Sequence, residues 1–338
     1  MMNDALSKTF HVPDDLAEET LVAALRRWLP GKSWSHVRGL VLSRRVMVNG
    51  NLCLDAGRRL KAQDVVKVLE HSAAAPPSID DVKIRFLDLH LAVVEKPAGM
   101  TTLRHPEERN WPRRRKQLQP TLDETLPRII ERKQHRGPRT RGVPRRLRAV
   151  HRLDRETSGL MVFARTVEAE SQLGTQFKKH SIHRLYLAVV PGRIEAQTID
   201  TRLVDDRGDG RRGSSRDPKL GKRAVTHVRP VERLDGYTVV ECQLETGRTH
   251  QIRIHLSEIG HPVCGDKVYR GPYPGTPLVD ASGAPRVALH AAELGFDHPL
   301  TGEPMQFSMP LPNDLVVLID RLRGKPAARN RPRGKSRR

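Results

Sequence analysis

The stretch that decides the fold is His151-Arg152-Leu153-Asp154-Arg155-Glu156-Thr157-Ser158-Gly159-Leu160. It is a polar loop that runs into an apolar segment, 160–164, typical of a buried strand. Arg152 and Arg155 flank Asp154, and nearby positive charge and backbone donors favour its ionised form. A carboxylate at the mouth of a strand can serve as a nucleophile or base. The residues alone leave a second role open, in which Asp154 or Ser158 stabilises the turn through side-chain to backbone hydrogen bonds.

The net charge indicates a polyanionic partner. The 338 residues include 60 Lys+Arg and 39 Asp+Glu, a net charge of +21. Each phosphate that a cation neutralises releases counterions, so this excess favours nucleic acid over a surface that is charged only for solubility. Aromatic residues make up 4% of the chain, which argues against a single-strand binder built on stacking platforms.

The cysteines and apolar segments favour a reducing cytoplasm and no membrane contact. Cys53, Cys242 and Cys264 lie far apart, in no metal-ligand spacing, and their odd number argues against a disulfide framework. We expect them to be small buried residues. The first fifteen residues lack an apolar core of signal-peptide length, and the longest apolar runs have the length of strands.

Residues 16–69 predict a small α/β module. Helical spacing covers Leu21 to Leu29 and then Val37 to Leu42. Val46-Met47-Val48-Asn49-Gly50 is a strand entering an Asn-Gly turn, and residues 64–68 alternate like a closing strand. This order resembles the S4-like RNA-binding domain, although Gln63-Asp64 stands where that family usually carries Gly-Asp. The resemblance implies that Arg38, Arg44 and Arg45 lie on an RNA face.

The rest of the chain predicts an α+β domain over residues 79–321. Residues 1–75 hold the first module and the start of a linker rich in Ala and Pro, 72–78. Strand-like alternation covers 91–96, 160–165, 184–190 and 237–245, and the clearest helix is 167–179. A mainly antiparallel mixed sheet flanked by helices follows.

Two basic stretches look irregular. Residues 104–148 form an insertion rich in Arg, Lys, Pro and Gly, and residues 322–338 form a tail without acidic residues. Runs of one sign are usually disordered or become ordered on a partner, so we expect both to contact RNA phosphates.

The stretch 151–160 resembles the signature of the RluA family of pseudouridine synthases, with a complete match. Other motifs of that family follow in order, with Arg184 in place of the usual Lys: Glu95-Lys96-Pro97-Ala98-Gly99-Met100, Arg184-Leu185-Tyr186-Leu187-Ala188, Thr246-Gly247-Arg248-Thr249-His250-Gln251-Ile252-Arg253-Ile254-His255-Leu256, Gly260-His261-Pro262-Val263, Gly265-Asp266, Leu289-His290-Ala291 and Phe296 to Pro299. The resemblance covers most of residues 80–310.

The resemblance implies a role for each matching residue. Asp154 would be the catalytic carboxylate, Tyr186 would pack against the target base, and Arg248 would pair with Asp154. Arg152 would help to extrude the uridine by filling the gap that it leaves. The remaining cations expected on the RNA are Arg155, Lys96 and Arg184.

The third motif reads as a strand, a turn and a helix. Gly247 allows the turn, Thr249 can cap a helix on which Ile252, Leu256 and Ile259 share a face, and Gly260 with Pro262 ends it. His250 and His255 are five residues apart, on different faces of that helix, which argues against a metal site.

The implied reaction needs no cofactor, because uracil leaves the sugar through nitrogen 1 and returns through carbon 5 with no atom gained or lost. The expected substrate is a flipped uridine in structured RNA. The pairing of an S4-like domain with a synthase favours large-subunit ribosomal RNA, with transfer RNA still open, and we expect a monomer. The alternatives are an inactive RNA-binding or ribosome-assembly factor of the same fold and, more remotely, a hydrolase that releases free uracil.

Overall fold

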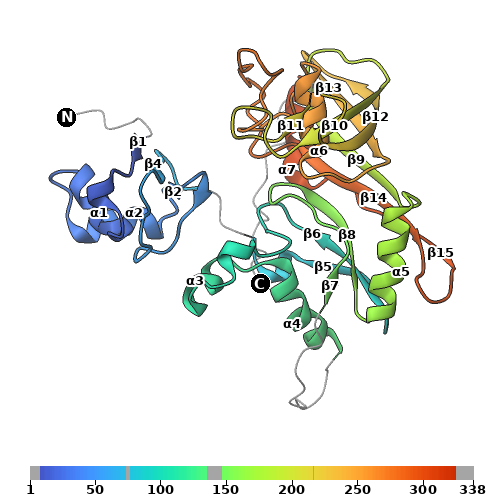
Figure 1. Ribbon diagram of the computed structural model, residues 1–338, viewed down its shortest axis with the longest axis horizontal. Helices are drawn as coiled ribbons and strands as arrows, with labels where there is room; N and C mark the ends of the chain where they lie inside the picture. The colour runs from blue at the N-terminus through green and yellow to red at the C-terminus, as the bar shows by residue number, and fades with distance from the viewer. Residues whose placement is uncertain (1–7, 74–76, 135–146, 216, 325–338) are drawn as a thin grey trace, which may run out of the picture. The chain divides into compact units, whose positions relative to one another are not determined.

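The computed structural model describes residues 8–73, 77–134, 147–215 and 217–324. They fall into two compact units (Figure 1): unit 1 contains Met1–Pro76 and His105–Pro120, and unit 2 contains Pro77–Arg104 and Thr121–Arg338. Unit 1 thus includes part of the stretch expected to be a basic insertion of the catalytic domain. No described helix is long and apolar enough to span a membrane.

Unit 1 carries a four-stranded antiparallel sheet in the order β1-β4-β2-β3. Its strands are β1 (Lys8–His11), β2 (Val46–Val48), β3 (Asn51–Leu52) and β4 (Val65–Val68), and its helices are α1 (Leu21–Trp28), α2 (Trp34–Leu42), α3 (Arg113–Leu118) and the short 3-10 helices at Asp14–Leu16 and Pro106–Glu108. The predicted helices and Asn-Gly hairpin are confirmed. Strand β1 was not predicted.

The turns of unit 1 explain its sequence. Asn49 and Gly50 have φ of 51° and 74°, as a two-residue hairpin turn requires. Gln63, where a glycine was noted as usual, also has a positive φ, 64°, so this chain accepts some backbone strain there. The next residue, Asp64, is buried and accepts a 2.7 Å hydrogen bond from the Asn49 amide, which joins the hairpin to β4.

Unit 2 is built on an eleven-stranded sheet, and the prediction of a mainly antiparallel sheet is confirmed. The main path is β11-β10-β12-β13-β9-β14-β8-β6-β5, with β15 beside β14 and β7 beside β8. The β14–β8 pair is parallel, and the other pairs are antiparallel. The strands are β5 (Lys83–Leu87), β6 (Leu91–Lys96), β7 (Arg148–Ala149), β8 (Ser158–Ala164), β9 (His183–Pro191), β10 (Gln197–Val204), β11 (Gly213–Ser214), β12 (Lys222–Arg233), β13 (Tyr237–Leu244), β14 (Leu289–Asp297) and β15 (Pro304–Ser308).

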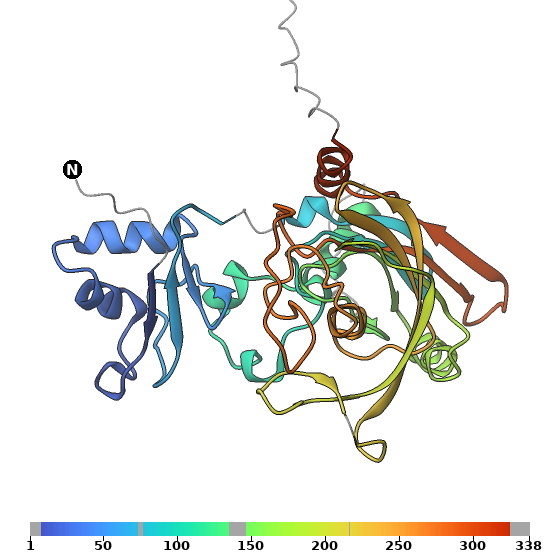
Figure 2. The same ribbon diagram turned by 90° about the horizontal axis from the view of Figure 1, so that it is seen from above.

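Helices cover both faces of this curved sheet (Figure 2). They are α4 (Leu122–Gln134), α5 (Val167–Lys178), α6 (Gln251–Glu258), α7 (Asn313–Leu322) and a 3-10 helix at Ile79–Asp81. In β8, Leu160 and Val162 join the cluster with α5, whereas Met161 and Phe163 join the cluster with α4, α6 and α7. Because this strand is buried on both faces, it reads as a continuous apolar run.

The expectation of an irregular stretch over 104–148 is wrong for residues 113–118 and 122–134, which form α3 and α4. Leu122, Leu126 and Ile130 recur every four residues and are buried in the main core, so the helix packs despite its charge. Residues 135–146 and 325–338, where the basic stretches were expected to be irregular, lie outside the described residues. The three cysteines are buried, as predicted.

Candidate active site

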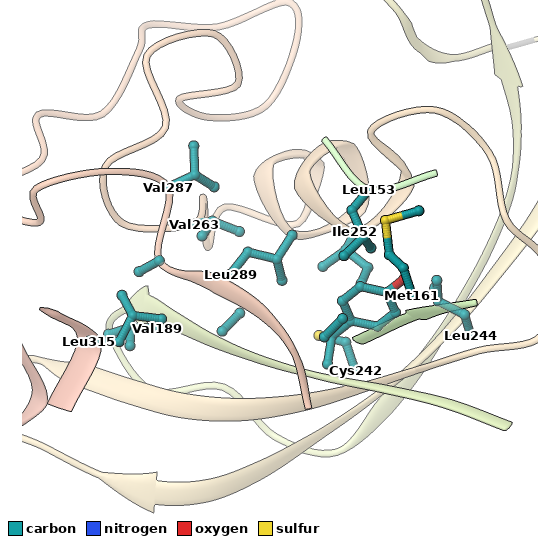
Figure 3. Close-up of a cluster of buried hydrophobic side chains, with 14 of the residues drawn as sticks. Leu153, Met161, Val189, Cys242, Leu244, Ile252, Val263, Val287, Leu289 and Leu315 are labelled. Atoms are coloured by element: carbon teal, nitrogen blue, oxygen red, sulfur yellow. The ribbon is translucent and has the colours of Figure 1, made fainter. Parts of the chain in front are cut away.

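One pocket of unit 2 contains the three residues expected to carry the chemistry. Asp154 precedes β8, Tyr186 lies on β9, and Arg248 lies in the turn after β13; all three line the pocket. Its apolar wall belongs to the main core (Figure 3) and consists of Leu153, Leu244, Ile252 and Leu289. The cavity volume is about 60 Å³, which is below the usual range of small-ligand sites.

The loop that carries Asp154 is anchored just before it, at His151 and Leu153. His151 Nε2 accepts a 3.0 Å hydrogen bond from the Val162 N–H, and burial lowers the pKa of His151 to about 3, so the ring stays a neutral acceptor. Leu153 is buried, and the Thr102 hydroxyl donates to its carbonyl at 2.7 Å. These contacts leave the Asp154 side chain at the pocket, 17% exposed.

Lys96 is buried under this loop, which corrects the expectation that it contacts RNA. Its side chain is fully buried, and Nζ donates to the carbonyls of Pro97, Met100 and Arg155 at 3.0, 2.8 and 3.2 Å. Burial lowers the pKa of Lys96 to about 7, while Asp154 acts in the opposite direction. Lys96 thus ties the first motif to the loop of Asp154.

Ser158 and Gly159 stabilise the end of the loop. Ser158 Oγ lies 2.9 Å from His290 Nδ1 and accepts a hydrogen bond from Arg286 at 3.1 Å. Gly159 has φ of 131°, and a Cβ there would collide with the backbone of Ala291 on β14. Ser158 therefore holds the loop through the side chains of His290 and Arg286, not through the side-chain to backbone hydrogen bonds of the alternative that the sequence left open. The carboxylate of Asp154 faces a cation.

That cation is Arg253, which corrects the expected pairing of Asp154 with Arg248. Arg253 Nη1 donates to Asp154 Oδ2 at 3.1 Å. Its Nε and Nη2 donate to Asp266 at 2.6 and 3.0 Å, and the side chain of Asp266 is fully buried. The two carboxylates raise the pKa of Arg253 against the effect of burial, so its charge persists.

Arg248 lies at the rim instead. Its side chain is exposed, and Nε donates to the Arg223 carbonyl at 3.0 Å. Thr249 does not cap α6, because the cap residue is His250 in a left-handed conformation, φ 59°, and Gln251 Oε1 accepts the Arg248 N–H at 3.0 Å. This helix start directs Arg253, not Arg248, at Asp154. Gly260 ends the helix, as predicted.

Tyr186 lies in the pocket wall with Arg184 behind it. Tyr186 is 8% exposed, and burial raises the pKa of its phenol. Arg184 is also buried, and its Nη2 donates to the Glu245 carbonyl at 2.9 Å. The expectation that Arg184 contacts RNA is therefore corrected, because the guanidinium supports the end of β13.

The other predicted cations differ in exposure. Arg152 is exposed and lines the pocket. Arg155 is half-buried and donates from Nε to the Gly99 carbonyl at 3.2 Å. In unit 1, Arg38 is exposed on α2, whereas Nε of Arg44 and of Arg45 donates to the carbonyls of Ala73 and Leu69, each at 2.9 Å.

His255 is a structural histidine. It is fully buried, with Nδ1 2.9 Å from Thr226 Oγ1 and Nε2 3.0 Å from Thr201 Oγ1, and burial lowers its pKa to about 4. Across the part of the chain that the structure describes, no group of three or more His, Cys, Asp or Glu side chains is placed to hold a metal ion.

Comparisons with known proteins agree with this geometry. Residues 90–258 match the family described as RNA pseudouridylate synthase, and residues 19–66 match the S4 domain. The chain is 36% identical over 324 residues to "Ribosomal large subunit pseudouridine synthase D" of Nitrosomonas europaea, covering 93% of this chain and 88% of that protein. The protein of the same name from Pseudomonas aeruginosa is 34% identical, covering 95% and 98%. The solved structure "Human RNA Pseudouridylate Synthase Domain Containing 4" is 25% identical with a TM-score of 0.55, covering 71% of this chain and 92% of that one.

Three residues of the site were not predicted from the sequence. They are Arg253, its partner Asp266, and Tyr269, whose hydroxyl lies 2.9 Å from Nδ1 of the pocket residue His250. Gly265-Asp266 was noted only as a motif. The available signal was Arg253 in the helix of the third motif, between apolar residues at 252 and 254, because a buried guanidinium requires carboxylate partners.

Proposed function

Because this chain belongs to the RNA pseudouridine synthase family, it converts uridine in RNA to pseudouridine, and we propose that Asp154 is its catalytic carboxylate. The observation that carries the proposal is the pocket in which Asp154 meets Arg253 beside Tyr186. The guanidinium of Arg253 directs the carboxylate next to the apolar wall of the pocket.

The reaction breaks the bond between uracil nitrogen 1 and the sugar, turns the base, and joins carbon 5 to the same sugar carbon. The hydrogen on carbon 5 leaves as a proton and nitrogen 1 takes up a proton, so no atom is gained or lost overall. Water attacking the sugar would leave an abasic site, so the apolar wall formed by Leu153, Leu244, Ile252 and Leu289 would protect the intermediate stage. Tyr186 would pack on the base, and its raised pKa keeps the phenol protonated.

The exposed arginines at the pocket are proposed to contact the RNA around the flipped uridine. Arg152 would fill the space that the flipped uridine leaves, an exchange that offsets the few kcal/mol lost on unstacking. Arg248, at the rim, would bind a phosphate near the target.

The proposed substrate is large-subunit ribosomal RNA, supported by the names of the relatives from Nitrosomonas europaea and Pseudomonas aeruginosa. The enzyme is proposed to act as a monomer in the cytoplasm. Mapping pseudouridine in total cellular RNA, with and without the gene, tests the substrate. Sites lost only from transfer RNA would contradict it.

The S4 unit is proposed to place the enzyme on its RNA. Arg38 on α2 is exposed there, with Trp34 and Leu42 four residues to either side and also exposed. Removing residues 1–75 should weaken RNA binding or relax site choice while the chemistry remains. An unchanged rate and unchanged selectivity on natural RNA would refute this placement role.

The test of the catalytic role is Asp154→Asn. The amide keeps the shape of the carboxylate but neither its charge nor its basicity, so pseudouridine formation should fall below detection while RNA affinity stays within about threefold, below 1 kcal/mol. Equal loss of binding and activity would assign Asp154 a structural role, as would be expected of an inactive RNA-binding factor.

A further inference from the structure

His250 is the second polar side chain that faces Asp154. Its Nε2 lies 3.8 Å from Asp154 Oδ1, whereas Arg253 Nη1 lies 3.1 Å from Oδ2. The two oxygens of the carboxylate therefore face different partners. A separation of 3.8 Å is longer than a hydrogen bond, so the His250 contact is electrostatic.

The backbone holds the His250 ring at the pocket at some cost. His250 has φ of 59° and ψ of 16° as the cap of α6, without a side-chain capping bond. A left-handed conformation is unfavourable for an L-residue, and such strain gathers at functional sites. Glycine or asparagine would fit this backbone more easily, so the imidazole has to be explained by its contacts.

Tyr269 orients the ring. Its hydroxyl lies 2.9 Å from His250 Nδ1, and the two rings meet edge to face with centroids 5.5 Å apart. The Tyr269 N–H donates to Asp266 Oδ1 at 3.0 Å. Asp266, which binds Arg253, therefore also fixes the residue that orients His250.

Charge and burial select one tautomer. Burial lowers the pKa of His250 against the opposing effect of Asp154, so the ring is neutral near pH 7. Burial also raises the pKa of Tyr269 to about 12, so its hydroxyl keeps its proton and can donate to Nδ1. The ring proton then lies on Nε2 and points toward a carboxylate oxygen of Asp154. In the other tautomer the lone pair of Nε2 would point toward that oxygen, which is unfavourable.

We propose that His250 is a positioning residue for Asp154, whose Nε2–H, set by the Tyr269 hydroxyl, holds Oδ1 while Arg253 holds Oδ2. The carboxylate is then kept in one rotamer for the uridine. This inference rests on the proposed catalytic role of Asp154.

The test compares His250→Asn with His250→Gln in the full-length enzyme. The substrate is an unmodified transcript of large-subunit ribosomal RNA carrying 5-tritiated uridine, and release of tritium reports the reaction. Asn suits the left-handed backbone and can still reach Tyr269, but it has no donor at the Nε2 position. We expect kcat to fall about tenfold, below the roughly 10²–10³-fold loss for a direct donor, with KM and Tm unchanged.

Gln carries an amide donor close to the Nε2 position but fits the backbone less well. We expect His250→Gln to recover kcat to within about threefold of the parent while its Tm is lower than that of His250→Asn. Activity and stability then change in opposite directions between the two variants. If kcat instead follows Tm, or if His250→Asn has full activity, the proposal is overturned.

Tyr269→Phe isolates the tautomer, because it keeps the ring and removes only the hydroxyl. We expect a loss of about threefold in kcat, less than for a direct donor, and an imidazole ¹⁵N spectrum in which His250 populates both tautomers. An unchanged spectrum would contradict the role of Tyr269. The Asp154→Asn variant separates the positioning role of His250 from the catalytic role of Asp154. If Asp154→Asn is inactive while His250→Asn is fully active, only the positioning role fails.

Discussion

Arg253 contacts Asp154 through one donor, Nη1 at 3.1 Å, while Nε and Nη2 of the same guanidinium hold Asp266 at 2.6 and 3.0 Å. The planar fork fixes the direction of Nη1 because its other edge is already bound. A lysine ammonium has no second edge and could not hold both carboxylates in this geometry.

Arg253→Lys should therefore lower kcat by about 10²-fold or more, with only a small change in RNA affinity. Arg248→Lys is the matched control, since Arg248 is exposed at the rim of the same pocket. It should lose less than about tenfold, mainly through KM, as expected for a phosphate contact. Tritium release under saturating and limiting RNA separates the two parameters. A larger loss for Arg248→Lys would restore the pairing expected from the sequence.

Lys96→Met should lower activity and stability without changing the salt dependence of RNA binding. The variant leaves the carbonyls of Pro97, Met100 and Arg155 without their buried donor, which costs about 1–3 kcal/mol and loosens the loop of Asp154. Because the Lys96 side chain is fully buried, the slope of log Kd against log salt should stay the same.

Arg152→Gln is the control for that measurement. Arg152 is exposed at the pocket, so the slope should decrease by about 1 if it neutralises one phosphate. A comparable decrease in Lys96→Met would show that Lys96 contacts RNA after all.

The fold and the location of the site were predictable from local patterns. Alternation predicted strands such as 91–96 and 237–245, and Asn49-Gly50 predicted the hairpin because both residues tolerate positive φ. Asp154 and Tyr186 were expected at one site, and they line one pocket. Helix α4 was not predicted, because the many charged residues of this stretch mask the four-residue spacing of Leu122, Leu126 and Ile130.

The side-chain contacts within the site could not be predicted from local patterns. The start of α6 decides which arginine of the third motif reaches Asp154. That start depends on the left-handed φ of His250, and a left-handed φ at a residue other than glycine cannot be predicted from the sequence. Lys96 and Arg184 were expected to contact RNA. Charged residues are rarely buried, but here backbone carbonyls compensate for the burial of both side chains.

Wild-type stability should decrease as the pH falls from about 6.5 toward 4, because of His255. Burial lowers its pKa to about 4 from the ordinary value of about 6.5, so the unfolded chain binds a proton in this window and the folded chain does not. The free energy of unfolding should decrease by roughly 3 kcal/mol across it. Above pH 6.5 the contribution is fully present. His151, with a pKa lowered to about 3, acts in the same direction.

Urea unfolding of wild type and His255→Gln at pH 7.5, 5.5 and 4.5 checks this. The variant should be less stable at pH 7.5, because the contacts with Thr226 and Thr201 are disturbed, and its deficit should shrink on acidification. His71→Gln is the control, because the His71 side chain is 87% exposed. If the deficit of His255→Gln is the same at all three pH values, proton linkage at His255 is excluded.

Gly159→Ala and Gly174→Ala form a matched pair that tests the close approach of β14 to the loop of Asp154. At Gly159 a Cβ would collide with the backbone of Ala291, at a φ of 131° that L-residues rarely adopt, whereas no neighbouring atom lies within 4 Å of a Cβ at Gly174 in α5. Gly159→Ala should lower the free energy of unfolding by about 3 kcal/mol or more, and Gly174→Ala should raise it by roughly 0.5–1 kcal/mol through helix propensity. In the fraction of Gly159→Ala that remains folded, activity should fall further than stability accounts for, because Gly159 follows the loop directly and any shift of β8 displaces Asp154. Equal activity per folded molecule in the two variants would mean that the loop holds its position without this contact.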